Sequence, residues 1–95
     1  MEILVMKIKL RAAWVKSLKE KRMILLSITK RISNKFNVSV AEVGEQNVHE
    51  IIVIGICAVG TSSDILHSMK EKILDFVEDN TDAELIDIEE EQITY

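Results

Sequence analysis

The sequence contains little cysteine and histidine, no proline and no long apolar run. Its 95 residues include one cysteine, Cys57, and two histidines. A single cysteine excludes an internal disulfide, and with only two histidines it falls short of a structural zinc site. The apolar start at residues 1–10 is interrupted by Lys7 and Lys9, and it is too short and too polar for a signal peptide or a membrane span. We therefore expect a cytoplasmic protein with no membrane association, no metal and no cofactor.

Linker-like composition is also absent. The chain has no low-complexity tract, and its length of 95 residues suits one domain. An apolar fraction of 47% favours a globular fold over disorder. We expect a single domain that spans residues 1–95.

Hydropathy patterns divide the chain into four strands and two helices. Strand-like alternation or short apolar runs occupy residues 3–10, 36–43, 50–59 and 84–93. Apolar residues follow a helical spacing in residues 17–35 and 64–78. The order β-α-β-β-α-β with right-handed crossovers predicts a ferredoxin-like α+β fold, in which two helices cover one face of a four-stranded antiparallel sheet.

The alternation also assigns side chains to the two faces of this sheet. In the last strand it places Ile86 and Ile88 inward, against the helices. We expect Asn80 just after the second helix, because Asn tolerates the left-handed conformation. The open face of the sheet, which points away from the helices, is expected to carry Ile3, Val5, Ala41, Val53 and Cys57. A face this apolar is a candidate homodimer interface.

Charge is divided unevenly along the chain. Residues 1–37 hold 10 of the 12 Lys and Arg but only two of the 16 Asp and Glu. Four cations crowd the expected start of the first helix, in the segment KSLKEKR (16–22). Ser17 suits an N-cap, and Glu20 stands three residues later, as a capping box requires. The cations are nevertheless unfavourable there, because a helix N-terminus carries a partial positive charge.

Three explanations for these cations remain open at the level of sequence. They are balanced by acids elsewhere in the chain, they bind a phosphate or the RNA backbone, or they bind an acidic protein partner. The acids would come from the end of the second helix, from the connection between the second and third strands, or from the segment that leads into the last strand. They are Asp75, Glu78, Asp79, Glu42, Glu45, Glu50, Asp82 and Glu84. The binding residues would be Ser17, Lys19, Lys21 and Arg22.

Cross-strand pairing predicts a second set of charge contacts. Lys7 and Lys9 are expected to face Asp87 and Glu89 on the neighbouring strand.

No catalytic constellation can be recognised. The expected central strands lack the aromatic residues on which an RNA-recognition sheet stacks bases. The segment RAAWVK (11–16) lacks the glycines of an acylphosphatase-like loop, and no Ser-His-Asp or Cys-His set stands out. Trp14 either caps the core or contacts a partner. Met23 and Leu26 either widen the inward stripe of the first helix or form an exposed patch.

Two motifs resemble a known family. The segment SLKEKR (17–22), followed by FNVSVAEV (36–43), resembles the YlxP-like bacterial family, a domain of unknown function, and Gly55 and ILDFVE (73–78) also fit. The resemblance implies a small cytoplasmic protein of ferredoxin-like fold with no established activity. Genes of this family often lie beside those for a translation initiation factor and a ribosome-binding factor. The implied partners are therefore ribosomal RNA or a translation-related protein.

These observations together lead us to expect a small non-enzymatic binding module. It would act in translation or ribosome assembly through RNA or protein contacts. A structural or regulatory homodimer, formed through the open face of the sheet, is the alternative.

Overall fold

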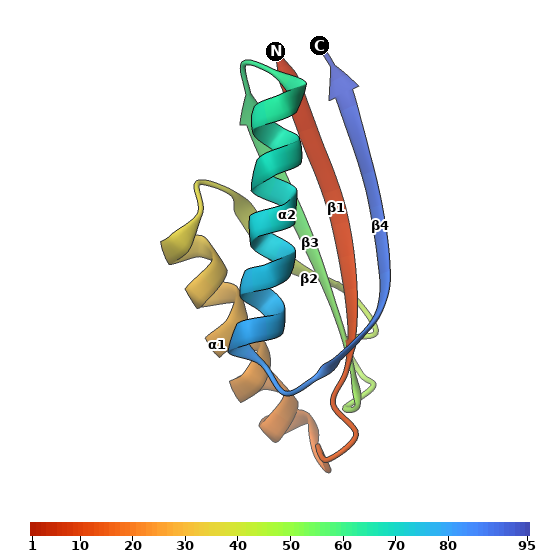
Figure 1. Ribbon diagram of the computed structural model, residues 1–95. Coiled ribbons are helices and arrows are strands. Elements are labelled where there is room, and N and C mark those ends of the chain that lie inside the picture. The colour runs from red at the N-terminus through yellow and green to blue at the C-terminus, as the bar shows by residue number, and fades with distance from the viewer.

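All six expected elements are present in the structure, a computed structural model that describes residues 1–95. They are β1 (Glu2–Arg11), α1 (Leu18–Lys35), β2 (Ser39–Gly44), β3 (Ile51–Gly60), α2 (Ser63–Asn80) and β4 (Glu84–Thr94). The strands form one antiparallel sheet in the order β2-β3-β1-β4. Both helices lie on one face of it (Figure 1). The predicted ferredoxin-like α+β fold is therefore confirmed.

A serine residue caps the N-terminus of each helix. The hydroxyl of Ser17 accepts a hydrogen bond from the backbone N–H of Glu20 at 3.1 Å. The carboxylate of Glu20 in turn accepts from the backbone N–H of Lys16 at 3.2 Å, one residue before the N-cap. Ser62 caps α2 in the same way, through the N–H of Ile65 at 3.3 Å. These contacts satisfy amide groups that a helix N-terminus leaves without partners.

The helix ends differ from the prediction in two details. Phe36 is the C-cap of α1, and its ring packs edge-to-face on Phe76 with 5.6 Å between ring centroids. Strand β2 therefore starts at Ser39 rather than at residue 36. Asn80 does not follow α2 but is its last residue, where its side-chain N–H donates to the carbonyl of Phe76 at 2.8 Å. This bond adds a side-chain contact to the last turn of α2, and Thr81, which follows it, is extended (φ −148°) rather than left-handed.

The hydrophobic core lies between the sheet and the two helices. Strands β1 and β3 contribute every second residue, as the alternation predicts, and the helices contribute one stripe each. The buried apolar residues include Met6, Ile8, Leu10, Ile52, Ile54, Ile56, Ile28, Ile32, Ile73 and Val77. Burying side chains of this size contributes roughly 1.5–3 kcal/mol each, so this layer dominates the stability.

Strand β4 is the exception to the inward prediction. Ile88 pairs with Ile8 and therefore lies on the helix side of the sheet, yet it remains partly exposed. No helix covers this edge of the sheet (Figure 1). Ile86 stands at a shift in register and is also exposed. Ile88 therefore faces the helix side as predicted, but neither residue is buried against a helix. Neither helix is long and apolar enough to cross a membrane.

Candidate binding surface on the first helix

Helix α1 exposes a stripe that combines cations with apolar side chains. Helical spacing places five exposed residues on the side opposite the core: Lys19, Arg22, Met23, Leu26 and Lys30. We call these five residues the α1 outer surface. Met23 and Leu26 are 67% and 68% exposed, so they do not widen the inward stripe. They form an apolar patch with cations on both sides.

The cations of this surface are not balanced by the end of α2. None of the ion pairs in the structure includes Lys19, Arg22 or Lys30. The last turn of α2 lies beside Arg31, whose guanidinium donates to the Asn80 side chain at 3.4 Å. The three acids near this end, Asp75, Glu78 and Asp79, form no ion pair with α1. These three acids therefore form no ion pair with the helix start, whereas Glu42, another acid named for internal balance, pairs with Lys21.

Lys21 is the one cation of the segment that has an internal partner. Its side chain is only 1% exposed, and its ammonium group donates to the backbone carbonyls of Glu45 and Val48, the latter at 2.8 Å. The carboxylate of Glu42 lies 3.3 Å from the same nitrogen. The ammonium thus joins α1 to the β2–β3 connection. This corrects the expectation that Lys21 contributes to an exposed binding surface, because a ligand in solvent cannot reach its charge.

Ser17 and Glu20 already occupy the N-terminus of α1. The Ser17 hydroxyl accepts a hydrogen bond from the backbone N–H of Glu20 as the N-cap, and the Glu20 carboxylate accepts one from the backbone N–H of Lys16. A negative group therefore stands where a phosphate would bind to the helix end. Of the four residues expected to bind an anion, Lys19 and Arg22 remain exposed cations with no ion pair.

Trp14 extends the α1 outer surface. It belongs to the loop between β1 and α1, and it is 48% exposed. With Met23, Arg31 and Asp82 it lines a shallow hollow of about 320 Å³ between α1 and the residues after α2. The ring therefore continues the apolar patch of Met23 toward the end of α2.

The open face of the sheet divides into an apolar and a charged part. Val5 and Cys57 are exposed, and with Ala41 and Val43 they line a hollow of about 330 Å³. Val53 was expected on the same apolar face. It is buried by its neighbours, so it contributes little exposed surface. Ile3 is partly buried.

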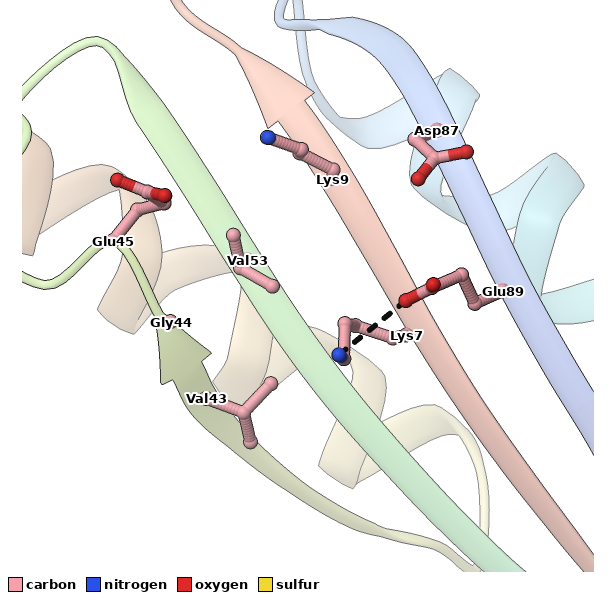
Figure 2. A pocket seen from close by; sticks show the side chains of 8 residues that line it. All are labelled: Lys7, Lys9, Val43, Gly44, Glu45, Val53, Asp87 and Glu89. Atoms are coloured by element: carbon pink, nitrogen blue, oxygen red, sulfur yellow. Dashed lines mark ion pairs between the residues drawn. The ribbon is translucent and has the colours of Figure 1, made fainter.

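The charged part of the open face is balanced within the chain. Figure 2 shows Lys7 and Lys9 on β1 opposite Glu89 and Asp87 on β4. The Lys7 ammonium lies 3.3 Å from the Glu89 carboxylate, and Lys9 pairs with Asp87 in the strand register. The predicted cross-strand arrangement is confirmed. Because both side chains of the Lys7–Glu89 pair are more than half exposed, it contributes only ~0–1 kcal/mol.

The second buried lysine, Lys70, was not recognised from the sequence. Its ammonium lies 2.9 Å from Glu90 and 3.5 Å from Glu71. The hydrogen bond that the Lys70 ammonium donates to Glu90 raises the pKa of Lys70 above its ordinary value, against the opposing effect of desolvation. The position of each lysine in the sequence could have indicated that its side chain is buried. Lys21 precedes Leu25 by four positions, and Lys70 follows Leu66 by four, so each stands in the apolar stripe of its helix.

The arrangement defines a small ferredoxin-like α+β domain with an exposed surface of cations and apolar side chains on one helix. No group of three His, Cys, Asp or Glu side chains lies close enough to hold a metal ion. Residues 3–90 match the family described as "Protein of unknown function (DUF503)", and the chain belongs to this family. The match includes α1, β2, β3 and α2 in full and all of β1 and β4 except Glu2 and the last four residues of β4.

Known proteins resemble the chain in sequence and in fold. It is 40% identical over 62 residues to the "Uncharacterized protein YlxP" of Bacillus subtilis (strain 168), a match that covers 65% of this chain and 67% of that protein. This agrees with the family resemblance of the SLKEKR and FNVSVAEV segments. Among solved structures, the "De novo designed protein Foldit4" superimposes with a TM-score of 0.54 at 15% identity, over 100% of this chain and 99% of that one. The second likeness concerns the fold alone.

Proposed function

We propose that this chain is a non-enzymatic binding module whose α1 outer surface, extended by Trp14, contacts an acidic protein partner. One observation carries the proposal. Three cations without ion pairs flank two apolar side chains that are about two-thirds exposed, all on one face of α1. An apolar patch with a charged rim is the usual composition of a protein contact.

The chemistry of the surface favours a protein partner over RNA. An RNA backbone is contacted by cations and polar groups, and RNA bases stack on aromatic side chains, so an aliphatic centre adds little to RNA binding. The centre of this surface is aliphatic, formed by Met23 and Leu26, and its single aromatic residue lies at one end. Methionine and leucine side chains pack against apolar residues of a partner, while Lys and Arg at the rim meet acidic ones.

The proposed setting is translation or ribosome assembly in the cytoplasm. It follows from the resemblance to the YlxP-like family, whose genes often lie beside those for a translation initiation factor and a ribosome-binding factor.

A charge-neutralising variant tests the proposal. Lys19, Arg22 and Lys30 are replaced together with Gln, and the tagged protein is used to capture partners from a bacterial lysate at low and high salt, followed by assays for ribosomal subunits and associated factors. We expect the wild type to retain a translation-related protein at low salt and to release it as salt rises. The variant should lose it at both salt concentrations.

A matched control keeps the same change of charge elsewhere. Arg11, Lys35 and Lys72 are exposed and form no ion pair, so their joint replacement with Gln should leave capture unchanged. Ribonuclease treatment separates the two partner classes. Capture that survives it supports a protein partner, whereas capture that disappears would assign the surface to RNA. Equal loss in both triple variants would reduce the effect to net charge and overturn the proposal.

The open face of the sheet supports a second candidate, a homodimer. Its observation is the apolar hollow of about 330 Å³ beside Val5 and Cys57. Association through such a face would tolerate salt, unlike the contact at α1. Sedimentation at high micromolar concentration should then show a dimer, and Val5→Lys should dissociate it. A wild-type monomer at that concentration would remove this candidate.

A further inference from the structure

The two edges of the sheet differ in how they are protected against pairing with another strand. An edge strand presents unpaired backbone groups, and proteins commonly block it with charge. Strand β4 carries five acids and no cation along one edge: Glu84, Asp87, Glu89, Glu90 and Glu91. Strand β2, at the other edge, has the sequence SVAEVG with Glu42 as its only charge. The ammonium of Lys21 already balances that charge.

The outer backbone of β2 has no partner within the chain. Strand β3 flanks β2 on one side only. Of the backbone hydrogen bonds that lie outside helices and strands, none involves residues 39–44. No side chain supplies a hydrogen bond to these residues either. The N–H and C=O groups on the outer side of β2 are therefore free to pair with an added strand.

A groove runs between this edge and α1. It has a volume of about 320 Å³ and is lined by Arg22, Leu25, Leu26, Thr29, Val40, Ala41 and Glu42. Its walls are thus an apolar stretch of helix and a strand edge, the geometry in which domains bind peptides by strand addition. Because Lys21 compensates Glu42, the charge that remains uncompensated in the groove is the guanidinium of Arg22.

We propose that an extended segment of the acidic partner adds to β2 as a fifth strand and lies in the groove between β2 and α1. Its alternate side chains are apolar and pack on Leu25, Leu26 and Val40, and a carboxylate at one end meets Arg22. Backbone hydrogen bonds to β2 hold the segment, and the apolar and acidic positions select it. This inference rests on the proposed function and specifies how the partner is held.

Charge argues against a second copy of the chain as the occupant. A symmetric pairing of two β2 strands would bring two α1 helices together along the same sheet face. The cations of one helix, Arg22 and Lys30 among them, would then approach those of the other. Like charges across an interface oppose binding, whereas an acidic segment meets the same cations favourably.

The test uses two synthetic decapeptides of alternating valine and threonine, one with glutamates at both ends and the other with lysines. Binding is followed by amide chemical shifts and by hydrogen exchange at individual residues of the protein. We expect the glutamate peptide to shift residues 22–29 and 39–44 and to slow exchange of the outward amides of β2. We expect the lysine peptide to bind at least about tenfold more weakly, because it places like charge beside Arg22.

A charge reversal and a matched control sharpen the result. In Arg22→Glu the preference should invert, so that the lysine peptide binds better. Lys72→Glu changes an exposed cation of α2 outside the groove and should leave the preference unchanged. Leu26→Asn should weaken both peptides, since it removes apolar contact from the groove wall without adding a charge.

Four outcomes would overturn the inference. In the first, millimolar peptide does not slow hydrogen exchange of the β2 amides; in the second, the peptide shifts only amides on the open face of the sheet near Val5. In the third, the glutamate and lysine peptides bind equally well. In the fourth, the β2 amides are protected by self-association of the protein when no peptide is present. Its failure is distinguishable from failure of the proposed function. If Gln at Lys19, Arg22 and Lys30 abolishes capture of the partner while peptides never protect β2, the binding surface stands and only strand addition is wrong.

Discussion

Replacing Lys21 with methionine tests the energetic role of the buried ammonium directly. Methionine keeps most of the length and volume of the lysine stem and removes the charge. The carboxylate of Glu42, whose side chain is 21% exposed, then loses its only cation, and the carbonyls of Glu45 and Val48 lose their donor. Breaking a buried ion pair on one side costs about 3–5 kcal/mol.

The expected loss lies at or somewhat below the lower end of that range. Glu42 keeps some contact with water, and Glu45 and Val48 belong to an exposed turn where water can replace the lost donor. Removing the desolvation of the ammonium offsets part of the cost. We therefore expect Lys21→Met to lower the free energy of unfolding by about 2–4 kcal/mol, a large share of the ~5–15 kcal/mol that a domain has.

Urea denaturation with a double-mutant cycle measures this loss. The second variant, Glu42→Leu, and the double variant complete the cycle. We expect the double variant to be more stable than Lys21→Met alone, because no uncompensated carboxylate remains. The loss in Lys21→Met should persist in 1 M salt, since a buried pair is little screened. Lys19→Met, at an exposed position of the same helix turn, serves as the control and should stay close to the wild type.

Two results would refute this reasoning. A loss below about 0.5 kcal/mol would mean that water reaches Glu42 and replaces the ammonium. A loss that disappears in high salt would mean that Lys21 acts as a surface charge, contrary to its 1% exposure.

Three further changes give independent expectations. Ser17→Ala removes the helix cap and should cost ~1 kcal/mol in thermal or urea unfolding, and an unchanged melting temperature would contradict the capping role. The pKa of Lys70 is raised above 10.5 in the folded state. The contribution of Lys70 to the free energy of unfolding is therefore fully present below pH 10.5, and it is lost as the pH rises through the pKa of the folded state. The stability advantage of the wild type over Glu90→Gln should therefore be constant from neutral pH to about pH 10 and shrink above it; an advantage that grows there would contradict the assignment. Gly55→Ala would place a Cβ 2.7 Å from a methyl group of Val43 and should cost about 1–3 kcal/mol, and Val43→Ala in the same chain should restore most of the loss.

The order and type of the six elements could be predicted from sequence because periodicity is a local property. Apolar residues at every second position in β1 and β3, and at helical spacing in α1 and α2, identify each element without its neighbours. Ser17 could be recognised as a cap for the same reason, since its partner lies three residues away. The boundary of β2 was less predictable, because Phe36 fits a strand pattern yet packs on Phe76 as the end of α1.

The roles of the charged residues needed the tertiary structure. KSLKEKR looks like one basic cluster, but the fold separates it: Lys21 turns inward to the β2–β3 connection, while Lys19 and Arg22 face solvent. The inward position of Lys21 could be inferred from the apolar stripe of α1. Glu42 was among the acids expected to balance this segment, but the two carbonyl partners could not be inferred, because Glu45 and Val48 lie 24 and 27 residues further along the chain.

Sequence alone therefore determined the fold class, the helix start at Ser17 and the pairing of Lys7 with the acidic last strand, because each depends on local spacing or on strand order. Only the tertiary structure decided that Ile88 stays partly exposed, that Val53 is buried, and that the groove beside β2 exists. Burial depends on which elements cover a residue from the side. The two helices pack on β1, β2 and β3 and leave the β4 edge uncovered (Figure 1), and no local pattern records that coverage.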